Sequence, residues 1–323
     1  MLKIGNLELT YPLILAPMAG ISDLPFRLLN RKFGCELAFI EMINARAIGY
    51  KSIRTERMLT STIQDRPLGI QLLGCEPKFI LRALDILSKY KFDILDFNAA
   101  CPARKVTRRG EGASLLKEPK KLKKLLRIIV KNSRHPVSVK IRSGWDKDSL
   151  PAREIALYCQ DAGIKALFIH GRTKEQEYSG SVDYSAIQEV KKALQIPVIA
   201  SGDIFSGQLA QKMFRETGCD GLAIARGAIG NPWIFQELTG LLRNGRIPQK
   251  PSLKQKIKVM LEHLNSCVDF HGQRIGIVLF RNFFSWYTKG FPSARRLREK
   301  AFKANTTVEM IRVIQTLNLT RQK

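Results

Sequence analysis

The 323-residue sequence has no apolar run that approaches the roughly 18 to 20 residues needed to cross a membrane. Its N-terminal segment has neither the apolar core nor the cleavage site of a signal peptide. The six cysteines are scattered, form no C-x-x-C pair and have no nearby histidines at metal-ligand spacing, so neither a disulfide framework nor a metal site is indicated. We therefore expect a globular cytoplasmic protein that binds no metal and does not insert into a membrane.

Acidic residues are scarce, and the resulting positive charge is unevenly distributed. The sequence has 28 Asp and Glu against 54 Lys and Arg, which gives a net charge of +26. Residues 244–323 hold 16 basic and 4 acidic residues, a surplus of 12 in 80 positions, whereas the preceding 243 residues carry a surplus of 14. This balance favours a polyanionic partner. Charge alone does not distinguish RNA from DNA or a membrane surface, and a merely solvated basic surface would give the same count.

Short apolar runs alternate with amphipathic stretches from Leu13 to about Leu242, which is the pattern of β-α units around a parallel sheet. The runs are almost continuously apolar, as expected of strands buried on both faces. There are eight of them, at residues 13–18, 36–41, 68–73, 93–98, 137–142, 166–171, 197–202 and 221–226. Helices are predicted between them, for example at 22–34 and 118–133. The sequence therefore predicts an α/β fold, a TIM (β/α)8 barrel over residues 1–243.

The pattern of strands stops after the barrel. Residues 243–252 contain two prolines and several basic residues and are typical of a linker. Residues 253–272 have apolar positions at helical spacing and end in glycine, and residues 280–302 continue with aromatics interleaved with Arg and Lys. We predict a small, basic, all-helical C-terminal domain over residues 244–323.

Polar residues lie at or just past the C-terminal ends of six predicted strands. They are Gln71, Asn98, Lys140, His170, Asp203 and Arg226. Barrel enzymes assemble their active sites at this rim. One polar residue after a strand means little because loops are polar in any case, but six residues of differing chemistry around one rim predict a shared pocket.

Two glycine-containing segments follow the seventh and eighth predicted strands, at residues 201–207 and 225–232. TIM barrels commonly bind a phosphate there through backbone N–H groups and a short helix, and glycine permits the close approach. On the fifth predicted strand, Lys140 and Arg142 are two residues apart and therefore share a face. A buried lysine there needs an anion such as a reduced flavin, although an ion-pair network within the barrel would also provide one.

Cys101 differs from the other cysteines because it lies three residues after Asn98, directly before Pro102, on a basic segment. The basic neighbours are Arg104, Lys105, Arg108 and Arg109. We expect Cys101 to be exposed and reactive as a nucleophile, a redox sensor or a general acid, and its spacing does not decide among these roles. Buried, inert thiols are expected for the remaining cysteines, Cys35, Cys75, Cys159, Cys219 and Cys267.

Several motifs together resemble one protein family. The main ones are LAPMAGISDLPFR (15–27), DFNAACPARKVTRRGEGASLL (96–116), VKIRSGWD (139–146) and FIHGRTKEQEYSG (168–180). Three further segments agree, IASGDI (199–204), ARGAIGNPWIF (225–235) and RNFFSWYTKGFPSARRLR (281–298). Along nearly its whole length the chain resembles the tRNA-dihydrouridine synthases, and among them the bacterial B-type group. The last segment resembles the helical RNA-binding domain of that family.

The resemblance implies an oxidoreductase that uses FMN, reduced by NADPH, to reduce the C5–C6 double bond of uridines in tRNA. It implies that FMN is held by Ala16, Pro17, Met18, Gln71, Lys140, His170, Ser201, Gly202, Asp203, Ala225 and Arg226. Hydride would pass to C6 of a uracil extruded from the tRNA fold while Cys101 protonates C5.

The resemblance also implies contacts with the RNA. Asn98 and Arg172 would position the base, and the helical domain would contact the RNA through Arg281, Arg295, Arg296 and Arg298. The only partner implied is tRNA; no obligate protein partner is indicated, and we expect a monomer.

Three positions depart from the family pattern. Ser201 stands where Asn is usual, Ala100 where Gly precedes the cysteine, and Arg281-Asn282 where an Arg-Lys pair is usual. We expect Ser201 to weaken FMN retention somewhat, and Ala100 to shift the loop if a positive φ is required there. Two other functions stay open: a flavin-dependent reductase of a free pyrimidine, similar to the dihydroorotate dehydrogenases, and an RNA-binding barrel without catalysis.

Overall fold

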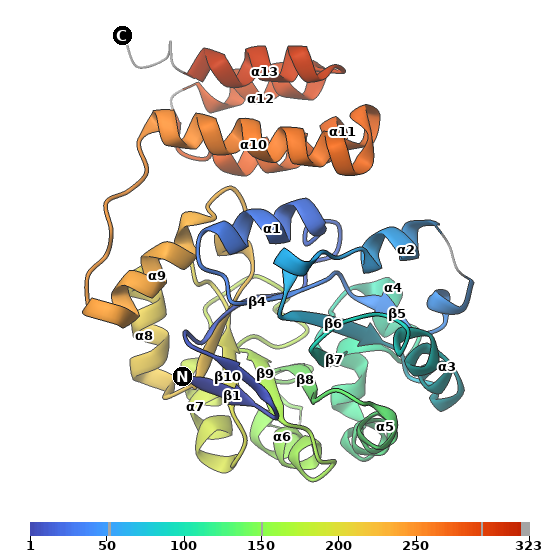
Figure 1. Ribbon diagram of the computed structural model, residues 1–323. Coiled ribbons are helices and arrows are strands. Elements are labelled where there is room, and N and C mark those ends of the chain that lie inside the picture. Colours follow the sequence, from blue (N-terminus) through green and yellow to red (C-terminus); the bar gives the residue numbers. More distant parts are fainter. Residues whose placement is uncertain (51–52, 150, 292, 318–323) are drawn as a thin grey trace.

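The structure, a computed structural model, describes residues 1–50, 53–149, 151–291 and 293–317. Eight parallel strands form a closed barrel in the order β4-β3-β11-β10-β9-β8-β7-β6, and pairing of β6 with β4 closes it (Figure 1). They are β3 (Leu13–Leu15), β4 (Leu37–Phe39), β6 (Leu68–Leu73), β7 (Ile94–Asn98), β8 (Val137–Arg142), β9 (Ala166–His170), β10 (Val198–Ser201) and β11 (Gly221–Ile224). Each strand lies within one of the eight predicted runs, so the predicted barrel is confirmed.

Three short strands lie outside the predicted pattern. β1 (Leu2–Ile4) and β2 (Leu7–Leu9) form an antiparallel hairpin, and β5 (Ile43–Asn44) pairs with the end of β6. The hairpin lies against the N-terminal strand ends, because a Cβ on Gly221 at the start of β11 would come within 3.1 Å of Leu2. Its apolar side chains join the cluster that fills the barrel. The hairpin therefore closes the end of the barrel opposite to the predicted site.

The inside of the barrel changes from apolar to polar toward the C-terminal strand ends. Phe39 and Phe168 pack edge to face with ring centroids 5.6 Å apart. Gly69 leaves room for them, since a Cβ there would lie 2.2 Å from the Phe39 ring. Residues two apart on a strand share a face, so the next inward positions are Gln71, Asp96, Asn98, Lys140, His170 and Ser201. An apolar plug thus supports a polar mouth.

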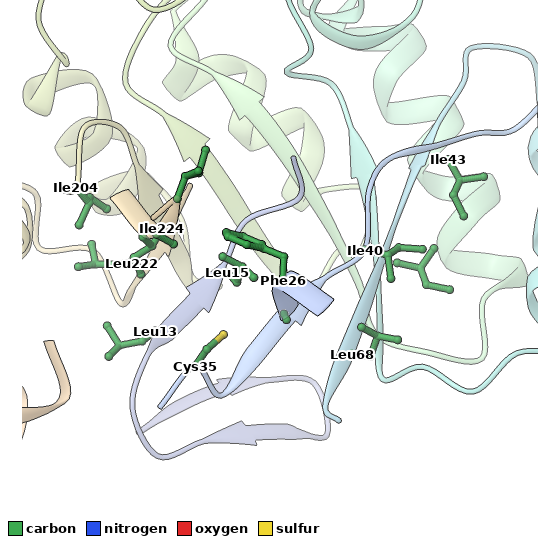
Figure 2. Packing of buried hydrophobic residues seen from close by; sticks show 14 of the residues in the cluster. Leu13, Leu15, Phe26, Cys35, Ile40, Ile43, Leu68, Ile204, Leu222 and Ile224 are labelled. Atoms are coloured by element: carbon green, nitrogen blue, oxygen red, sulfur yellow. The ribbon is translucent and has the colours of Figure 1, made fainter. Parts of the chain in front are cut away.

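Helices that follow the strands cover the outside of the barrel, except for the four-residue α4 (Arg104–Thr107), which lies in the loop after β7 at the mouth. The others are α1 (Leu24–Lys32), α2 (Ile53–Leu59), α3 (Pro77–Leu87), α5 (Pro119–Asn132), α6 (Ala152–Gln160), α7 (Tyr184–Ala193), α8 (Gly207–Thr217) and α9 (Trp233–Asn244). The outward strand residues pack under them: Leu15 of β3 lies beside Phe26 of α1 (Figure 2), and Leu13 of β3 and Leu222 of β11 belong to the same hydrophobic cluster. The strands are therefore buried on both faces, which is why their sequences lack polar alternation.

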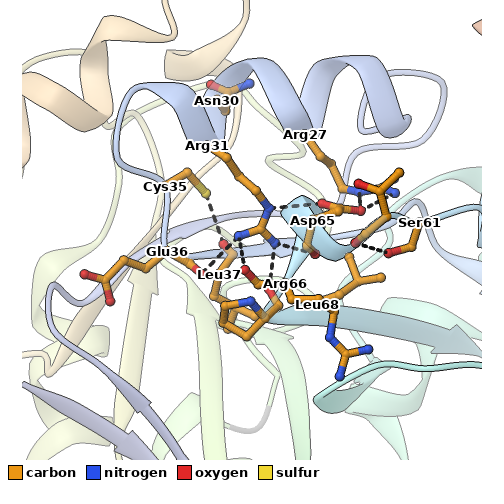
Figure 3. A network of polar contacts seen from close by, with 12 residues as sticks. Arg27, Asn30, Arg31, Cys35, Glu36, Leu37, Ser61, Asp65, Arg66 and Leu68 are labelled. Atoms are coloured by element: carbon orange, nitrogen blue, oxygen red, sulfur yellow. Dashed lines mark hydrogen bonds and ion pairs between the residues drawn. The ribbon is translucent and has the colours of Figure 1, made fainter.

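A buried carboxylate attaches α1 to the segment that leads into β6 (Figure 3). Asp65 accepts from Arg27 Nη2 at 2.7 Å and from Arg31 Nε at 3.0 Å, and both Asp65 and Arg27 are fully buried. Arg31 Nη2 also donates to the carbonyl of Pro67 at 2.7 Å. The two guanidinium groups compensate the buried carboxylate, and backbone carbonyls accept the remaining guanidinium N–H groups. The middle and the end of α1 are thereby fixed on the barrel.

Four helices follow the barrel: α10 (Leu253–His271), α11 (Gln273–Tyr287), α12 (Ala294–Lys303) and α13 (Thr307–Gln315). The predicted helix at 253–272 is confirmed, whereas residues 280–302 are divided between α11 and α12 around Gly290, whose φ is +82°. Figure 1 shows these helices stacked beyond α1. No helix in the described ranges is both long and apolar enough to span a membrane.

The helical domain rests on α1 and on the loop after β11. The Phe26 ring of α1 stacks on Phe283 of α11 with centroids 5.4 Å apart. His271 Nε2 lies 2.7 Å from the carboxylate of Asp23, which caps the N-terminus of α1. At Gly230, a Cβ would lie 2.6 Å from the backbone of α11. The mouth of the barrel and the helical domain are thus in direct contact.

Candidate active site

Five predicted site residues come from the inward ends of consecutive strands: Gln71, Asn98, Lys140, His170 and Ser201. Asn98 stands opposite Lys140 in the register of β7 and β8, and His170 stands opposite Ser201 in that of β9 and β10. All of them except Lys140, which is partly exposed, are buried. The structure therefore brings these five side chains together at the mouth of the barrel.

A hydrogen-bonded network connects two of these residues to a buried carboxylate. Asn98 Nδ2 donates to Gln71 Oε1 at 2.7 Å, and Gln71 Nε2 donates to Asp96 at 2.7 Å. The Ser138 hydroxyl donates to the other oxygen of Asp96, also at 2.7 Å. Burial raises the pKa of Asp96 to about 6, although the hydrogen bonds from Gln71 and Ser138 oppose this shift. Asp96 is a member of the site that the sequence analysis did not identify.

Lys140 and His170, both at the mouth, differ in charge at neutral pH. Burial and the neighbouring Arg142 lower the pKa of Lys140 to about 8, and its Nζ donates to Ser201 Oγ at 3.2 Å. Burial and the surrounding cations, Lys140 first, lower the pKa of His170 to about 2. At neutral pH the lysine is mostly charged and the imidazole is neutral, so the site offers a cation together with an uncharged donor or acceptor.

Asp203 connects the loop after β10 to two arginines. Its Oδ1 accepts from Arg226 Nη2 at 2.6 Å, and its Oδ2 pairs with Arg172. Burial raises the pKa of Asp203, but the two arginines outweigh burial and lower it on balance. The Tyr178 ring lies over Arg226, 4.7 Å from its guanidinium carbon, and is more than half exposed. The charges at this side of the mouth are thus held in fixed positions.

The loops after β10 and β11 touch through their backbones. Gly202 and Asp203 both have positive φ, +131° and +49°, and a Cβ on Gly227 would lie 1.9 Å from the carbonyl oxygen of Ile204. The backbone N–H groups of Gly202, Asp203 and Arg226 donate to no acceptor among the described residues. Free N–H groups beside an arginine fit an anionic ligand such as a phosphate.

The predicted segment Ala16–Pro17–Met18 follows β3 directly and reaches the same mouth. The Ala16 N–H donates to the carbonyl of Ile224 at 2.9 Å, just before the predicted Ala225 and Arg226. The Met18 N–H donates to Ser22 Oγ at 3.0 Å. The three residues therefore lie beside the phosphate-type loops, on the side of α1.

Cys101 is partly buried, so the expectation that it is exposed is wrong in part. Burial raises the pKa of its thiol, whereas the nearby cations Arg142 and Lys105 act in the opposite direction. The thiol consequently keeps its proton at neutral pH. A protonated thiol at a polar mouth can donate a proton, but it is a poor nucleophile.

The loop that carries Cys101 is held from three sides. Asn98 Oδ1 accepts the N–H groups of Ala100 at 3.0 Å and Cys101 at 2.9 Å. The Ala100 carbonyl accepts from Arg142 Nε at 2.7 Å. Gly112 permits a close approach, since a Cβ there would lie 2.8 Å from the carbonyl oxygen of Cys101. Ala100 does not have a positive φ, so the loop accepts alanine where glycine was expected.

The residues predicted to contact RNA differ in how free they are. Arg172 is buried and donates to the carbonyls of Ser179 and Gly180, while its Nη1 has no hydrogen-bond partner in the part of the chain that the structure describes. Arg281 donates to the carbonyl of Ala304, and Arg298 to the hydroxyl of Thr288. Of the other two, Arg295 pairs with Glu299 on its own helix, whereas Arg296 is exposed and makes no ion pair among the described residues.

A second group of cations lies beside Cys101. Arg104, Lys105, Arg108 and Arg109, on α4 and directly after it, are exposed. None of these four makes an ion pair with another residue in the described ranges. We call them the α4 cations. They form an unneutralised positive surface at the edge of the mouth, as a polyanionic partner requires.

The other cysteines follow the prediction with one exception. Cys35, Cys159, Cys219 and Cys267 are buried, but Cys75 is partly exposed on the loop between β6 and α3, where its thiol donates to the carbonyl of Arg109 at 3.2 Å. The prediction for Cys75 is wrong because the residue precedes α3 instead of packing within it. Asp96 had a detectable signal, since a carboxylate inside an apolar strand is unusual.

The sequence is similar to a family of known proteins along almost its whole length. The family described as "Dihydrouridine synthase (Dus)" matches residues 14–322. A protein from Pasteurella multocida named "tRNA-dihydrouridine synthase B" is 37% identical over 305 residues, covering 94% of this chain and 92% of the relative. One from Rickettsia bellii named "Probable tRNA-dihydrouridine synthase" is 37% identical over 300 residues, with 92% of both chains covered.

Solved structures are similar in fold at low identity. A 2-naphthoyl-CoA reductase superposes with a TM-score of 0.60 at 11% identity, covering 74% of this chain, and a histamine dehydrogenase from Rhizobium with 0.58 at 13% identity, covering 82%. The match spans about half the length of each, 51% and 50%. These two similarities concern the barrel fold.

Proposed function

This chain belongs to the dihydrouridine synthase family, and from that premise we propose that it reduces the C5–C6 double bond of uridines in tRNA, with FMN as cofactor and NADPH as reductant. The observation that carries the proposal is the protonated, partly buried Cys101 thiol at a mouth lined by inward-facing polar side chains. We divide the chain into a catalytic barrel, residues 1–243, and a helical RNA-binding domain, residues 244–323. We expect the protein to act as a monomer in the cytoplasm, where tRNA is found.

The residues at the mouth fit a flavin mononucleotide. Its phosphate would be held by the free N–H groups of the loops after β10 and β11 and by Arg226. Its ring would contact Ala16, Pro17 and Met18, and its polar edge Gln71, Lys140 and His170; Ser201, Gly202, Asp203 and Ala225 complete the set. The partly uncompensated charge of Lys140 suits a ring that becomes anionic on reduction. Reduced by NADPH, bound FMN supplies the hydride that reaches C6 of uracil.

The protein's own contribution to the reaction is a proton. Negative charge develops on the uracil ring when C6 receives hydride, and the ring is neutralised when the Cys101 thiol gives its proton to C5. The thiolate then regains a proton from solvent. The raised pKa of Cys101 keeps the donor protonated before each turnover. Asn98, which holds the Cys101 loop, would also position the base, together with Arg172.

The RNA partner is supported by two exposed cationic regions. The α4 cations lie at the edge of the mouth beside the thiol, and Arg296 and its neighbours lie on α12. A uracil inside tRNA must be extruded to reach a thiol in the barrel mouth, and the flanking phosphates would then lie near the α4 cations. A free pyrimidine has no phosphates for these cations to bind, which favours tRNA over a small substrate.

The test is Cys101→Ala, with Cys75→Ala as a matched control, since both cysteines are partly exposed on loops at the C-terminal strand ends. We expect Cys101→Ala to bind FMN and lose turnover of dihydrouridine-free tRNA by about 10²- to 10⁴-fold. Cys75→Ala should retain activity. Unchanged turnover of Cys101→Ala would remove this thiol from the mechanism, and activity on free uracil or orotate but not on tRNA would overturn the proposed substrate.

A further inference from the structure

Asp96 is a buried carboxylate one inward position below Asn98 on β7, 2% exposed. Among the described residues it has no hydrogen bond to the loops after β10 and β11 or to the thiol. Both of its oxygens are used: one accepts from Gln71 Nε2 and the other from Ser138 Oγ, each at 2.7 Å. Lys140 is the charged group whose attraction it feels. The remaining question is what this costly buried group does.

In the hydrogen bonds between Asp96 and the Cys101 loop, the donor is always on the side of the loop and the acceptor on the side of Asp96. Gln71 donates to Asp96, and Asn98 donates to Gln71. The N–H groups of Ala100 and Cys101 donate to Asn98. We call Asp96, Gln71 and Asn98 the amide relay. Its upper end is the backbone of the loop that carries the thiol, and its lower end is the carboxylate.

An ionised carboxylate can only accept hydrogen bonds, whereas each amide side chain can turn by 180° and exchange its donor for its acceptor. With a carboxylate at position 96, Gln71 must present its NH₂ to Asp96 and its oxygen to Asn98. Asn98 must then present its oxygen to the loop. With a donor at position 96, Gln71 could turn, and Asn98 would face the two N–H groups with its own NH₂.

We propose that Asp96 is a positioning residue for the reaction: as the acceptor-only end of the amide relay, it fixes the orientation of Gln71 and Asn98 and so holds the Cys101 loop in place. The inference rests on the proposed function in taking Cys101 as the proton donor. The order of the loop itself is measurable without turnover.

The first variant is Asp96→Asn, which has the same shape but can donate. The new amide can accept from Gln71 through its oxygen or donate to it through its NH₂, so both orientations of the amide relay become populated. Hydrogen exchange of the backbone over residues 98–103 should become faster by about tenfold or more, since the hydrogen bonds to the loop are lost in the turned orientation. We expect kcat to fall by a similar factor while KM for tRNA changes little, because the thiol and not the RNA surface is displaced. Ser138→Ala is the matched control: it removes a hydrogen bond to Asp96 but leaves the direction of the amide relay intact, so loop exchange should stay within about threefold of wild type.

The decisive variant exchanges the two side chains, Asp96→Asn with Asn98→Asp. The new amide at 96 donates to Gln71 Oε1, Gln71 turns and donates upward, and the new carboxylate at 98 accepts both from Gln71 and from the loop. The total charge is conserved. The amide relay therefore predicts that the double variant exchanges more slowly over residues 98–103 and melts at a higher temperature than Asp96→Asn, and melts above Asn98→Asp alone.

A double variant no better than the worse single variant, in exchange and in melting temperature, overturns the inference. If Asp96→Asn alone does not fold, recovery of folding in the double variant supports the amide relay, and failure to recover overturns it. A wild-type protein that makes no dihydrouridine would defeat the proposed function while leaving the exchange results to decide the amide relay by themselves.

Discussion

The barrel and the helical domain differ in which of their charged and polar side chains have partners. Within the barrel domain, two buried carboxylates have partners on both oxygens: Asp65 pairs with Arg27 and Arg31 of α1, and Asp96 accepts from Gln71 and Ser138. On the surface of the barrel, the α4 cations make no ion pair within the described part of the chain. The barrel therefore neutralises charge where it is buried and leaves it free where a partner could approach.

The helical domain is less uniform. At its base on α1, His263 is buried among aromatic rings, and its Nε2 has no hydrogen-bond partner among the described residues. On its surface, Arg281, Arg295 and Arg298 are engaged by other residues of the domain. Arg274, Arg296 and Arg312 are exposed and make no ion pair among the described residues. A count of basic residues in the sequence marks the helical domain as the more basic region. The structure adds a second region of exposed cations, the α4 cations beside the thiol, which the count does not reveal.

The largest expected effect is the loss of folding stability at acid pH that the buried His263 causes. Burial lowers its pKa from 6.5 to about 4. Between these values the unfolded chain binds a proton that the folded protein does not, so stability present above pH 6.5 is lost as the pH falls toward 4. The shift corresponds to about 3 kcal/mol. The difference in stability between wild type and His263→Leu/Tyr287→Phe should therefore shrink across this window in thermal or urea melts.

The Tyr287 change accompanies the histidine change because the two side chains form a hydrogen bond of 3.2 Å, and the double variant leaves neither partner orphaned. His170 also lowers the stability of the folded protein in acid, but it is present in both proteins, so its contribution cancels in the difference. A difference that stays constant from pH 7 to pH 4 would show that the His263 site gains solvent or a partner on protonation.

A smaller effect should separate the two cationic regions. Each lost phosphate contact lowers the slope of log affinity against log salt by about 1. Arg108→Ala/Arg109→Ala should therefore lower the slope for tRNA by about 2, whereas Arg295→Ala/Arg296→Ala should lower it by about 1, since Arg295 is held by Glu299.

The matched control removes two exposed cations from the opposite end of the barrel, Lys91→Ala/Arg134→Ala. Binding titrations at several salt concentrations should show an unchanged slope for this control. A larger loss for the α12 pair than for the α4 pair would reverse the comparison and make the helical domain the main phosphate contact.

The smallest effect concerns the cofactor. Ser201 Oγ accepts from Lys140 and donates to the carbonyl of Ile169, so it is already satisfied within the barrel and reaches little further. Ser201→Asn should retain FMN better than wild type by less than about tenfold, the worth of one hydrogen bond. Equilibrium dialysis of FMN measures this directly. Equal or weaker retention would mean that serine serves the flavin as well as asparagine.

Much of the candidate site could be predicted because strand periodicity is local. Gln71, Asn98, Lys140 and His170 lie where the ends of apolar runs placed them. The exposure of Cys101 was predicted wrongly because the sequence neighbours of a residue do not reveal what packs on it. Gly112 is eleven positions away, yet its backbone approaches the cysteine closely.

The sequence by itself determined the eight strands, the end of the barrel at which the polar residues gather and the excess of positive charge, because these follow from hydrophobic period and composition along the chain. Only the tertiary structure decided which polar groups meet, such as Asp96 with Gln71, and which cations stay free. These depend on the register between strands and on burial, which bring together residues that are distant in the sequence.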